Sequence, residues 1–271
     1  MSERLTAWVD GEPAATIPLD DRGLQYGDGL FETCVIRNGR VRFLDAHLTR
    51  LANGCARLGI ACDGDAVRAD LARAAEAAPA RALLKLIVTR GSGPRRGYAP
   101  QGAGCRRIVQ QVDAGATPDA AGVTLGLARL RLSATPALAG LKHLNRLENV
   151  LAAAEIEVPE FDVLLLDEDG NWVGGTMCNL FLVTRGVLAT PRVDRCGVAG
   201  VMRGIVLREA KSLGLQCEER WLRAADLERA DEVFVTNARI GVVPVTRVGE
   251  HSFDMRNVAL HLRNRIEALD A

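Results

Sequence analysis

The sequence ALAGLKHLNRLENVLA, residues 137–152, contains one of the three lysines in this chain. Lys142 stands between Leu141 and Leu144, just before a helix expected over residues 145–156, where partial burial would lower the pKa of its amine. A lysine that forms an imine with a carbonyl compound needs such a free amine. A surface lysine beside a helix start has the same local pattern, so position alone leaves both interpretations open.

The other two lysines stand in surroundings typical of structural residues. Lys85 lies among apolar residues in LLKLIV, an expected strand, and Lys211 is close to Glu209 on an expected helix. The remaining basic residues are arginines, which keep their proton at any useful pH. The sequence therefore favours Lys142 for amine chemistry.

Upstream of this segment the pattern is that of an antiparallel sheet with two helices. Asn38-Gly39 is a strong hairpin signal between short apolar runs, and apolar residues at helical spacing follow from Leu44 to Leu58. Expected strands cover residues 7–9, 31–37, 41–43, 83–89 and 107–112, and expected helices cover 44–58 and 64–78. We expect a small N-terminal α/β domain over residues 1–113.

The stretch DAGATPDAA, residues 113–121, is small, polar and contains proline, as domain boundaries commonly do. Beyond it we expect strands at 123–128, 161–167, 180–184, 187–189, 232–236 and 242–246, and helices at 145–156, 201–213, 224–230 and from 253. The sequence predicts an α+β fold of two domains, with residues 114–121 as linker and 122–271 as the larger domain. The cleft between domains is the default site.

Composition excludes several classes of protein. The 271 residues are 48% hydrophobic and 25% charged, and 34 basic residues balance 34 acidic ones, so we expect neither disorder nor a nucleic-acid partner. No apolar stretch is long enough for a membrane helix, and the start, MSERLTAWVDGEP, lacks signal-peptide features, which predicts a cytoplasmic protein without a membrane partner. Seven cysteines without CxxC spacing indicate small buried side chains rather than disulfides or a zinc site.

Common catalytic motifs are missing, but loops suited to anions are present. The chain has no GxSxG, HExxH or Walker motif, and its four histidines lack metal-ligand spacing, so we expect no metal. CGVAGVMRG, residues 196–204, places glycines before an apolar helix whose first N–H groups could bind phosphate. RGSGPRRGY, residues 90–98, concentrates arginines in a glycine-rich loop suited to carboxylates. Plain turns and solvated charges are the alternatives for these two loops.

These segments, in this order, resemble the fold-type IV pyridoxal-phosphate enzymes over nearly the whole chain. YGDGLFE at 26–32, HLTRL at 47–51, the lysine segment, NLF at 179–181, GVAGVMR at 197–203 and DEVFVTNA at 231–238 each have a counterpart in that family. The resemblance implies a small N-terminal domain, a larger C-terminal domain with a barrel-like sheet, pyridoxal 5′-phosphate bound between them, and a homodimer.

The resemblance also implies roles for particular residues. Lys142 would be the Schiff-base lysine. The other cofactor-binding residues would be Arg50, Val201, Met202, Asn237 and Ala238, with Arg203 as support behind them. Substrate-binding residues would be Phe31, Arg95, Arg96 and Tyr98.

Within the family, GLKHLNRLENVL and the arginine loop resemble the aminodeoxychorismate lyases more than the transaminases. That resemblance implies conversion of 4-amino-4-deoxychorismate to 4-aminobenzoate and pyruvate in folate biosynthesis. Lys142 would remove the proton from the carbon that bears the substrate nitrogen, and the ring would become aromatic as enolpyruvate leaves. A transaminase of D- or branched-chain amino acids is the alternative.

One position departs from the family pattern. Where the family has a glutamate that pairs with the pyridine nitrogen of the cofactor, this chain reads VGGTMCNLF, with Gly174 at that position. The loss weakens the cofactor as an electron sink. It favours an elimination that is driven by aromatisation over transamination, and it keeps a slow or inactive family member as a third alternative.

Overall fold

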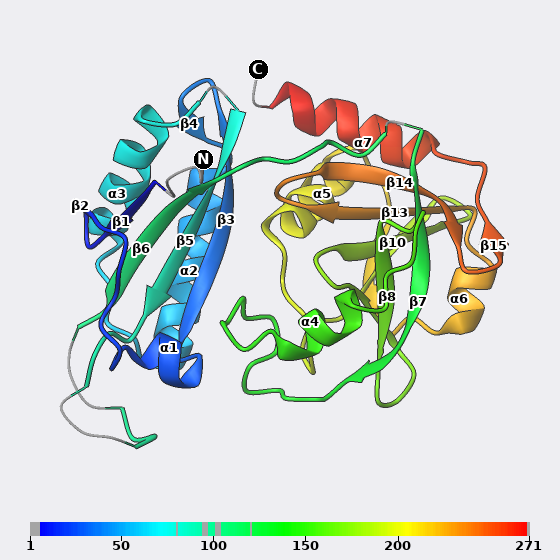
Figure 1. The fold of residues 1–271 in the computed structure, drawn as a ribbon. Helices are drawn as coiled ribbons and strands as arrows, with labels where there is room; N and C mark the ends of the chain where they lie inside the picture. The colour runs from blue at the N-terminus through cyan, green and yellow to red at the C-terminus, as the bar shows by residue number, and fades with distance from the viewer. Residues whose placement is uncertain (1–5, 80, 94–96, 101–103, 120, 270–271) are drawn as a thin grey trace. The chain divides into compact units, whose positions relative to one another are not determined.

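The computed structural model describes residues 6–79, 81–93, 97–100, 104–119 and 121–269, and it divides into two compact units (Figure 1). The first comprises residues 1–115 together with Lys142–Asn145, and the second comprises Ala116–Leu141 and Arg146–Ala271. The segment that carries Lys142 thus groups with the first unit, although in the sequence it lies beyond the expected domain boundary.

The first unit is built on an antiparallel sheet of six strands in the order β2-β1-β6-β5-β3-β4. A tight turn at Asn38 and Gly39, both with positive φ, joins β3 to β4, as the Asn-Gly signal predicts. The strands are β1 (Ala7–Val9), β2 (Glu12–Pro13), β3 (Gly29–Arg37), β4 (Arg40–Val41), β5 (Arg81–Thr89) and β6 (Arg106–Val112).

Helices α2 (Leu44–Leu58) and α3 (Gly64–Glu76) line a common pocket and so lie on the same side of this sheet. Helix α2 has the bounds that its apolar periodicity predicts, and it ends at Gly59 in the left-handed conformation. A short helix, α1 (Arg22–Tyr26), differs from the sequence prediction, which places no helix or strand between residues 9 and 31.

Strand β3 presents alternate residues to its two faces. Leu30, Glu32 and Cys34 are buried, and the first two contact α2, whereas Phe31 and Thr33 between them are half-buried. This period-2 pattern fixes which side chains of β3 face the helices and which face the opposite side.

The second unit contains a mixed sheet of nine strands. Its strands run in the order β12-β11-β10-β13-β14-β7-β8-β9, with β15 paired to β14. The last strand in this order, β9, nevertheless contacts β10 and β11 near the other end of the sheet, and Trp172 N at the start of β9 donates to Leu222 O, just after β12. The sheet therefore curls into the expected barrel-like form around an apolar core. Its strands are β7 (Val123–Leu132), β8 (Asp162–Asp167), β9 (Trp172–Gly175), β10 (Asn179–Thr184), β11 (Val187–Pro191), β12 (Cys217–Arg220), β13 (Glu232–Asn237), β14 (Gly241–Val248) and β15 (His251–Ser252).

Four helices accompany this sheet: α4 (Leu147–Ala153), α5 (Val201–Ser212), α6 (Ala224–Glu228) and α7 (Asn257–Ala268). Helices α5 and α7 pack on each other and on β13. The last helix begins after β15 rather than at the expected residue 253, because Phe253 is buried in the core instead. Within the described part of the chain, no helix has the length and apolarity to cross a membrane.

Candidate active site

Lys142 is positioned by backbone pairing with the edge of β3. Phe31 N donates to Lys142 O at 2.9 Å and Leu144 N donates to Gly29 O at 3.0 Å, so that residues 142–144 lie antiparallel beside residues 29–31. Directly opposed residues in such a pair project their side chains to the same face. Lys142 and Phe31 therefore share a face of the sheet.

The amine of Lys142 lies over the ring of Phe31. Its Nζ is 4.1 Å from the ring centroid, and the side chain is half-buried. Lys85, on β5, lies on the same face, with its Nζ 5.7 Å from that centroid. A second amine thus lies close to the proposed reactive one, which gives Lys85 a place near the site that its sequence surroundings did not suggest.

On the opposite face of β3, Glu32 joins two residues of α2. His47 Nδ1 lies 2.7 Å from Glu32 Oε2, and Arg50 donates from Nε to Glu32 Oε1 at 2.8 Å and from Nη2 to Oε2. Burial alone would raise the pKa of Glu32, but these hydrogen bonds and charges outweigh it and lower the pKa to about 2. Arg50 is thus oriented by a buried carboxylate, a partner that sequence reasoning did not identify.

Tyr98 belongs to a separate cluster of the first unit. Its ring packs edge-on against Tyr26, with centroids 5.5 Å apart, and Arg22 donates to the carbonyl oxygens of Gly97 and Tyr98. Arg22 is held in turn by Asp28 at 2.9 Å. Arg95 and Arg96, the expected substrate arginines, lie outside the described residues.

Apart from Arg50, which lies on α2 in the first unit, the expected cofactor-binding residues lie in the second unit. Val201 and Met202 form the first turn of α5, whose cap residue, Gly200, has no side chain to occupy the helix end. The first N–H groups of a helix have no partner within it, and the helix dipole favours an anion there. Arg203 points elsewhere, since it is buried and donates to Pro191 O and Glu219 Oε2.

Residues 177–179 form hydrogen bonds both with the loop that leads to α5 and with Asn237. Asn179 donates to Val198 O at 2.9 Å, in the loop that leads to α5. Asn237 donates to Met177 O at 3.3 Å and accepts hydrogen bonds from the backbone of residues 239 and 240. The side chain of Asn237 therefore shapes the turn that contains Ala238 and leaves backbone groups to face a ligand.

Gly174 adjoins the same segment but cannot carry a side chain in this conformation. Its φ is +151°, and a Cβ there would lie 2.6 Å from Cys178 O. The departure from the family pattern thus extends to the backbone, which occupies the space that a side chain at position 174 would need.

Asp162, at the start of β8, is a positioning residue that sequence reasoning missed. Its fully buried carboxylate accepts hydrogen bonds from Thr176 N at 3.0 Å, Thr176 Oγ1 at 2.6 Å and Met177 N at 3.3 Å. It thereby fixes the turn before Asn179. A single aspartate before an apolar run gives no sequence signal of this contact across the sheet.

Comparisons with known proteins agree on one family. The model of the aminotransferase class IV family matches residues 29–248. The chain is 37% identical to aminodeoxychorismate lyase of Vibrio harveyi over 89% of its length and 90% of the relative, and 30% identical to D-alanine aminotransferase of Bacillus licheniformis over 86% and 83%. The crystal structure of 4-amino-4-deoxychorismate lyase from Pseudomonas aeruginosa matches with a TM-score of 0.93 and 44% identity, covering 97% of this chain and 98% of that one.

Proposed function

Because this chain belongs to the class IV aminotransferase family, we propose that it is a pyridoxal-phosphate-dependent lyase that converts 4-amino-4-deoxychorismate to 4-aminobenzoate and pyruvate. The observation that carries the proposal is similarity to aminodeoxychorismate lyases along nearly the whole chain, together with a lysine that backbone pairing fixes beside an aromatic ring.

The residues present suit both the aldehyde group and the phosphate group of pyridoxal 5′-phosphate. Lys142 offers a primary amine on a half-buried face, and α5 offers N–H groups at a helix start with a glycine cap. Arg50, whose guanidinium Glu32 orients, and the turn at Asn237 and Ala238 would complete the phosphate site. Position 174 supplies no carboxylate to the ring nitrogen.

In the proposed reaction, Lys142 acts as the base. When bound, the cofactor withdraws electrons from the substrate carbon that bears the nitrogen. The Nζ of Lys142 takes the proton from that carbon, the bond to the enolpyruvyl oxygen breaks, and the ring becomes aromatic. The ring of Phe31 lies 4.1 Å from this Nζ and stabilises the positive charge that the amine gains with the proton.

Gly174 favours this reaction over transamination. A transaminase must hold the developing charge and return the proton elsewhere, which requires a stronger electron sink than an elimination that forms an aromatic ring. Transamination of D- or branched-chain amino acids remains the second candidate, since the chain is also similar to a D-alanine aminotransferase. Turnover of 2-oxoglutarate as amino acceptor would identify it.

The substrate has two carboxylates, and we assign their recognition to the arginine loop with Arg95, Arg96 and Tyr98. Phe31, beside Lys142, would contact the substrate ring. Arg22 holds the backbone of residues 97 and 98 and therefore positions the end of this loop.

We further propose a cytoplasmic homodimer. All seven cysteines are free thiols, as expected in a reducing compartment. Helix α4 exposes Leu147, Val150 and Leu151, which share one helical face and form an apolar surface suited to a second copy of the chain.

The test is the formation of 4-aminobenzoate from enzymatically prepared aminodeoxychorismate, with borohydride reduction and peptide mapping of the cofactor-loaded protein. We expect activity, and the pyridoxyl group on Lys142. Lys142→Ala should lose about four orders of magnitude in rate or more, whereas Lys85→Ala, its neighbour on the same face, should retain most activity. A visible absorbance band that borohydride removes, without lyase or transaminase turnover, would indicate an inactive family member.

A further inference from the structure

Three cysteines that the proposed reaction does not use meet in the first unit. Cys55 lies on α2, Cys62 lies between α2 and α3, and Cys105 immediately precedes β6. The thiol of Cys62 hydrogen-bonds with both Cys55 and Cys105, so Cys62 is the centre of the group. Among the described side chains, no group of three or more histidine, cysteine or acidic residues is arranged to hold a metal ion.

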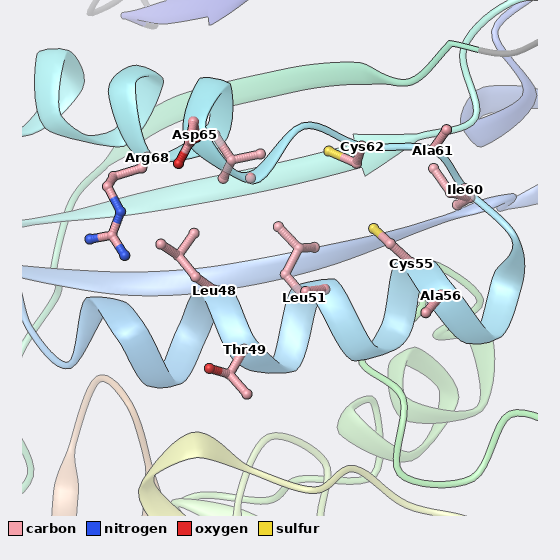
Figure 2. A pocket seen from close by; sticks show the side chains of 13 residues that line it. Leu48, Thr49, Leu51, Cys55, Ala56, Ile60, Ala61, Cys62, Asp65 and Arg68 are labelled. Atoms are coloured by element: carbon pink, nitrogen blue, oxygen red, sulfur yellow. The ribbon is translucent and has the colours of Figure 1, made fainter.

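Two of these thiols line a pocket between α2 and α3. The pocket has a volume of about 550 Å³ and is lined largely by apolar side chains, among them Leu48, Leu51 and Val67. Figure 2 shows the sulfur atoms of Cys55 and Cys62 directed into the space between the helices. Cys55 is only 5% exposed and Cys62 is half-buried, so a small reagent reaches the two sulfurs through this pocket.

The three thiols differ in acidity. The hydrogen bond from Cys62 is the main cause that lowers the pKa of Cys55, although burial opposes it. Cys62 receives a hydrogen bond from Cys105, which lowers its pKa, but its bond to Cys55 and its burial outweigh this and raise the pKa to about 11. The pKa of Cys105 is raised, first by its hydrogen bond to Cys62. Arg107 supplies positive charge near Cys62 and Cys105.

We propose that Cys55 and Cys62 form a peroxide-reactive dithiol, with Cys55 as the attacking sulfur and Cys62 as the resolving sulfur. A thiol that opens onto a pocket and has a second thiol in contact can be oxidised by a small oxidant that enters the pocket. Cys105 hydrogen-bonds with Cys62 and not with Cys55, so it stabilises the pair without being the resolving residue.

The reaction proceeds in two steps with a hydroperoxide as oxidant. The sulfur of Cys55 gives up its proton and attacks one peroxide oxygen, the O–O bond breaks, and the departing oxygen takes up that proton and leaves as water or an alcohol, which gives a sulfenic acid on Cys55. The sulfur of Cys62 then attacks this sulfur, and the hydroxyl group leaves with the Cys62 proton as water. The two sulfurs together lose two electrons, which the peroxide bond gains, and a Cys55–Cys62 disulfide results.

Peptide mapping of the cofactor-loaded protein tests the proposal. Trypsin places the three cysteines on separate peptides, 51–57, 58–68 and 97–106, and Cys217 of β12 on peptide 212–220. After treatment with stoichiometric hydrogen peroxide and blocking of free thiols, we expect peptides 51–57 and 58–68 to be linked, and dithiothreitol to separate them. Cys217, half-buried with its pKa raised by burial, is the control within the same digest.

Two variants separate the roles. In Cys62→Ser, dimedone should label Cys55 at least about tenfold more than Cys217, because the sulfenic acid has no resolving thiol. In Cys105→Ser, the link between Cys55 and Cys62 should still form. Any of three results would overturn the proposal: a Cys62–Cys105 link in place of the expected one, equal labelling of Cys55 and Cys217 in Cys62→Ser, or an unreacted Cys55 in the wild-type digest. The wild-type digest is decisive even if a variant fails to fold.

Discussion

At the scale of single residues, the buried carboxylate of Glu32 makes the first unit sensitive to acid. Its pKa of about 2 lies below the ordinary value of 4.5, so the ionised form stabilises the fold fully above pH 4.5, and this stabilisation is lost as the pH falls towards 2. The side chain is almost fully buried, and the shift corresponds to about 3 kcal/mol.

Glu32→Gln should therefore reduce the loss of unfolding free energy between pH 4.5 and 2 by about 3 kcal/mol, the share that belongs to Glu32, while lowering stability at neutral pH because Arg50 loses its partner. Urea unfolding at several pH values measures both effects. Glu12→Gln, at an exposed position on β2, is the control and should keep the acid loss of the parent protein. If Glu32→Gln and the parent protein lost the same amount of unfolding free energy on acidification, Glu32 would not be a source of the acid sensitivity.

Gly174 is the second residue whose role can be tested directly. At φ +151°, with Cys178 O 2.6 Å from the added Cβ, Gly174→Ala should lower the free energy of unfolding by about 2 kcal/mol or more. Gly186→Ala has a positive φ but nothing within 4 Å, and should cost only about 1 kcal/mol. Equal costs would show that the contact with Cys178 is unimportant. Gly174→Glu, the change that the family pattern suggests, meets the same obstacle and cannot simply restore the missing carboxylate.

At the scale of elements, the start of α5 depends on close contact with β10. A Cβ at Gly200 would overlap Asn179 Oδ1, whereas Gly204, one turn later in the same helix, has nothing within 4 Å. Gly200→Ala should therefore displace the helix start and weaken binding of pyridoxal 5′-phosphate by about tenfold or more, the effect of losing one hydrogen bond to a charged group. Absorbance titration measures the Kd, and Gly204→Ala should leave it unchanged. Equal affinity in both variants would argue against a phosphate site at this helix.

Elements with local signals were predictable from sequence, and contacts across the fold were not. Apolar periodicity gave α2 its correct bounds, and Asn38-Gly39 gave the hairpin. Strands β9 and β12 were missed, because β9 is short and glycine-rich and β12 reads CEER, without apolar alternation. The lysine itself was identifiable by resemblance, but its pairing with β3 joins residues more than a hundred positions apart, and no local pattern encodes that register.

At the scale of the whole molecule, the proposed homodimer can be measured by sedimentation velocity. We expect a species of about twice the 29.1 kDa chain mass at micromolar concentration. Val150→Glu, in the apolar face of α4, should shift it to monomer, since burying an unpaired charge at an interface is costly. Leu260→Glu, on the partly exposed side of α7, should not. A wild-type monomer, or a dimer unaffected by Val150→Glu, would exclude this interface.

The pairing of residues 142–144 with β3 also has a consequence for how the protein is made. During synthesis residues 1–115 leave the ribosome well before residue 145, so the nascent first unit folds with the N–H of Phe31 and the C=O of Gly29 still without their partners at a sheet edge. Such an edge can recruit a strand from another chain. The lysine segment is therefore also the piece that closes this edge, and a chain terminated after residue 115 should self-associate more readily than the full-length protein.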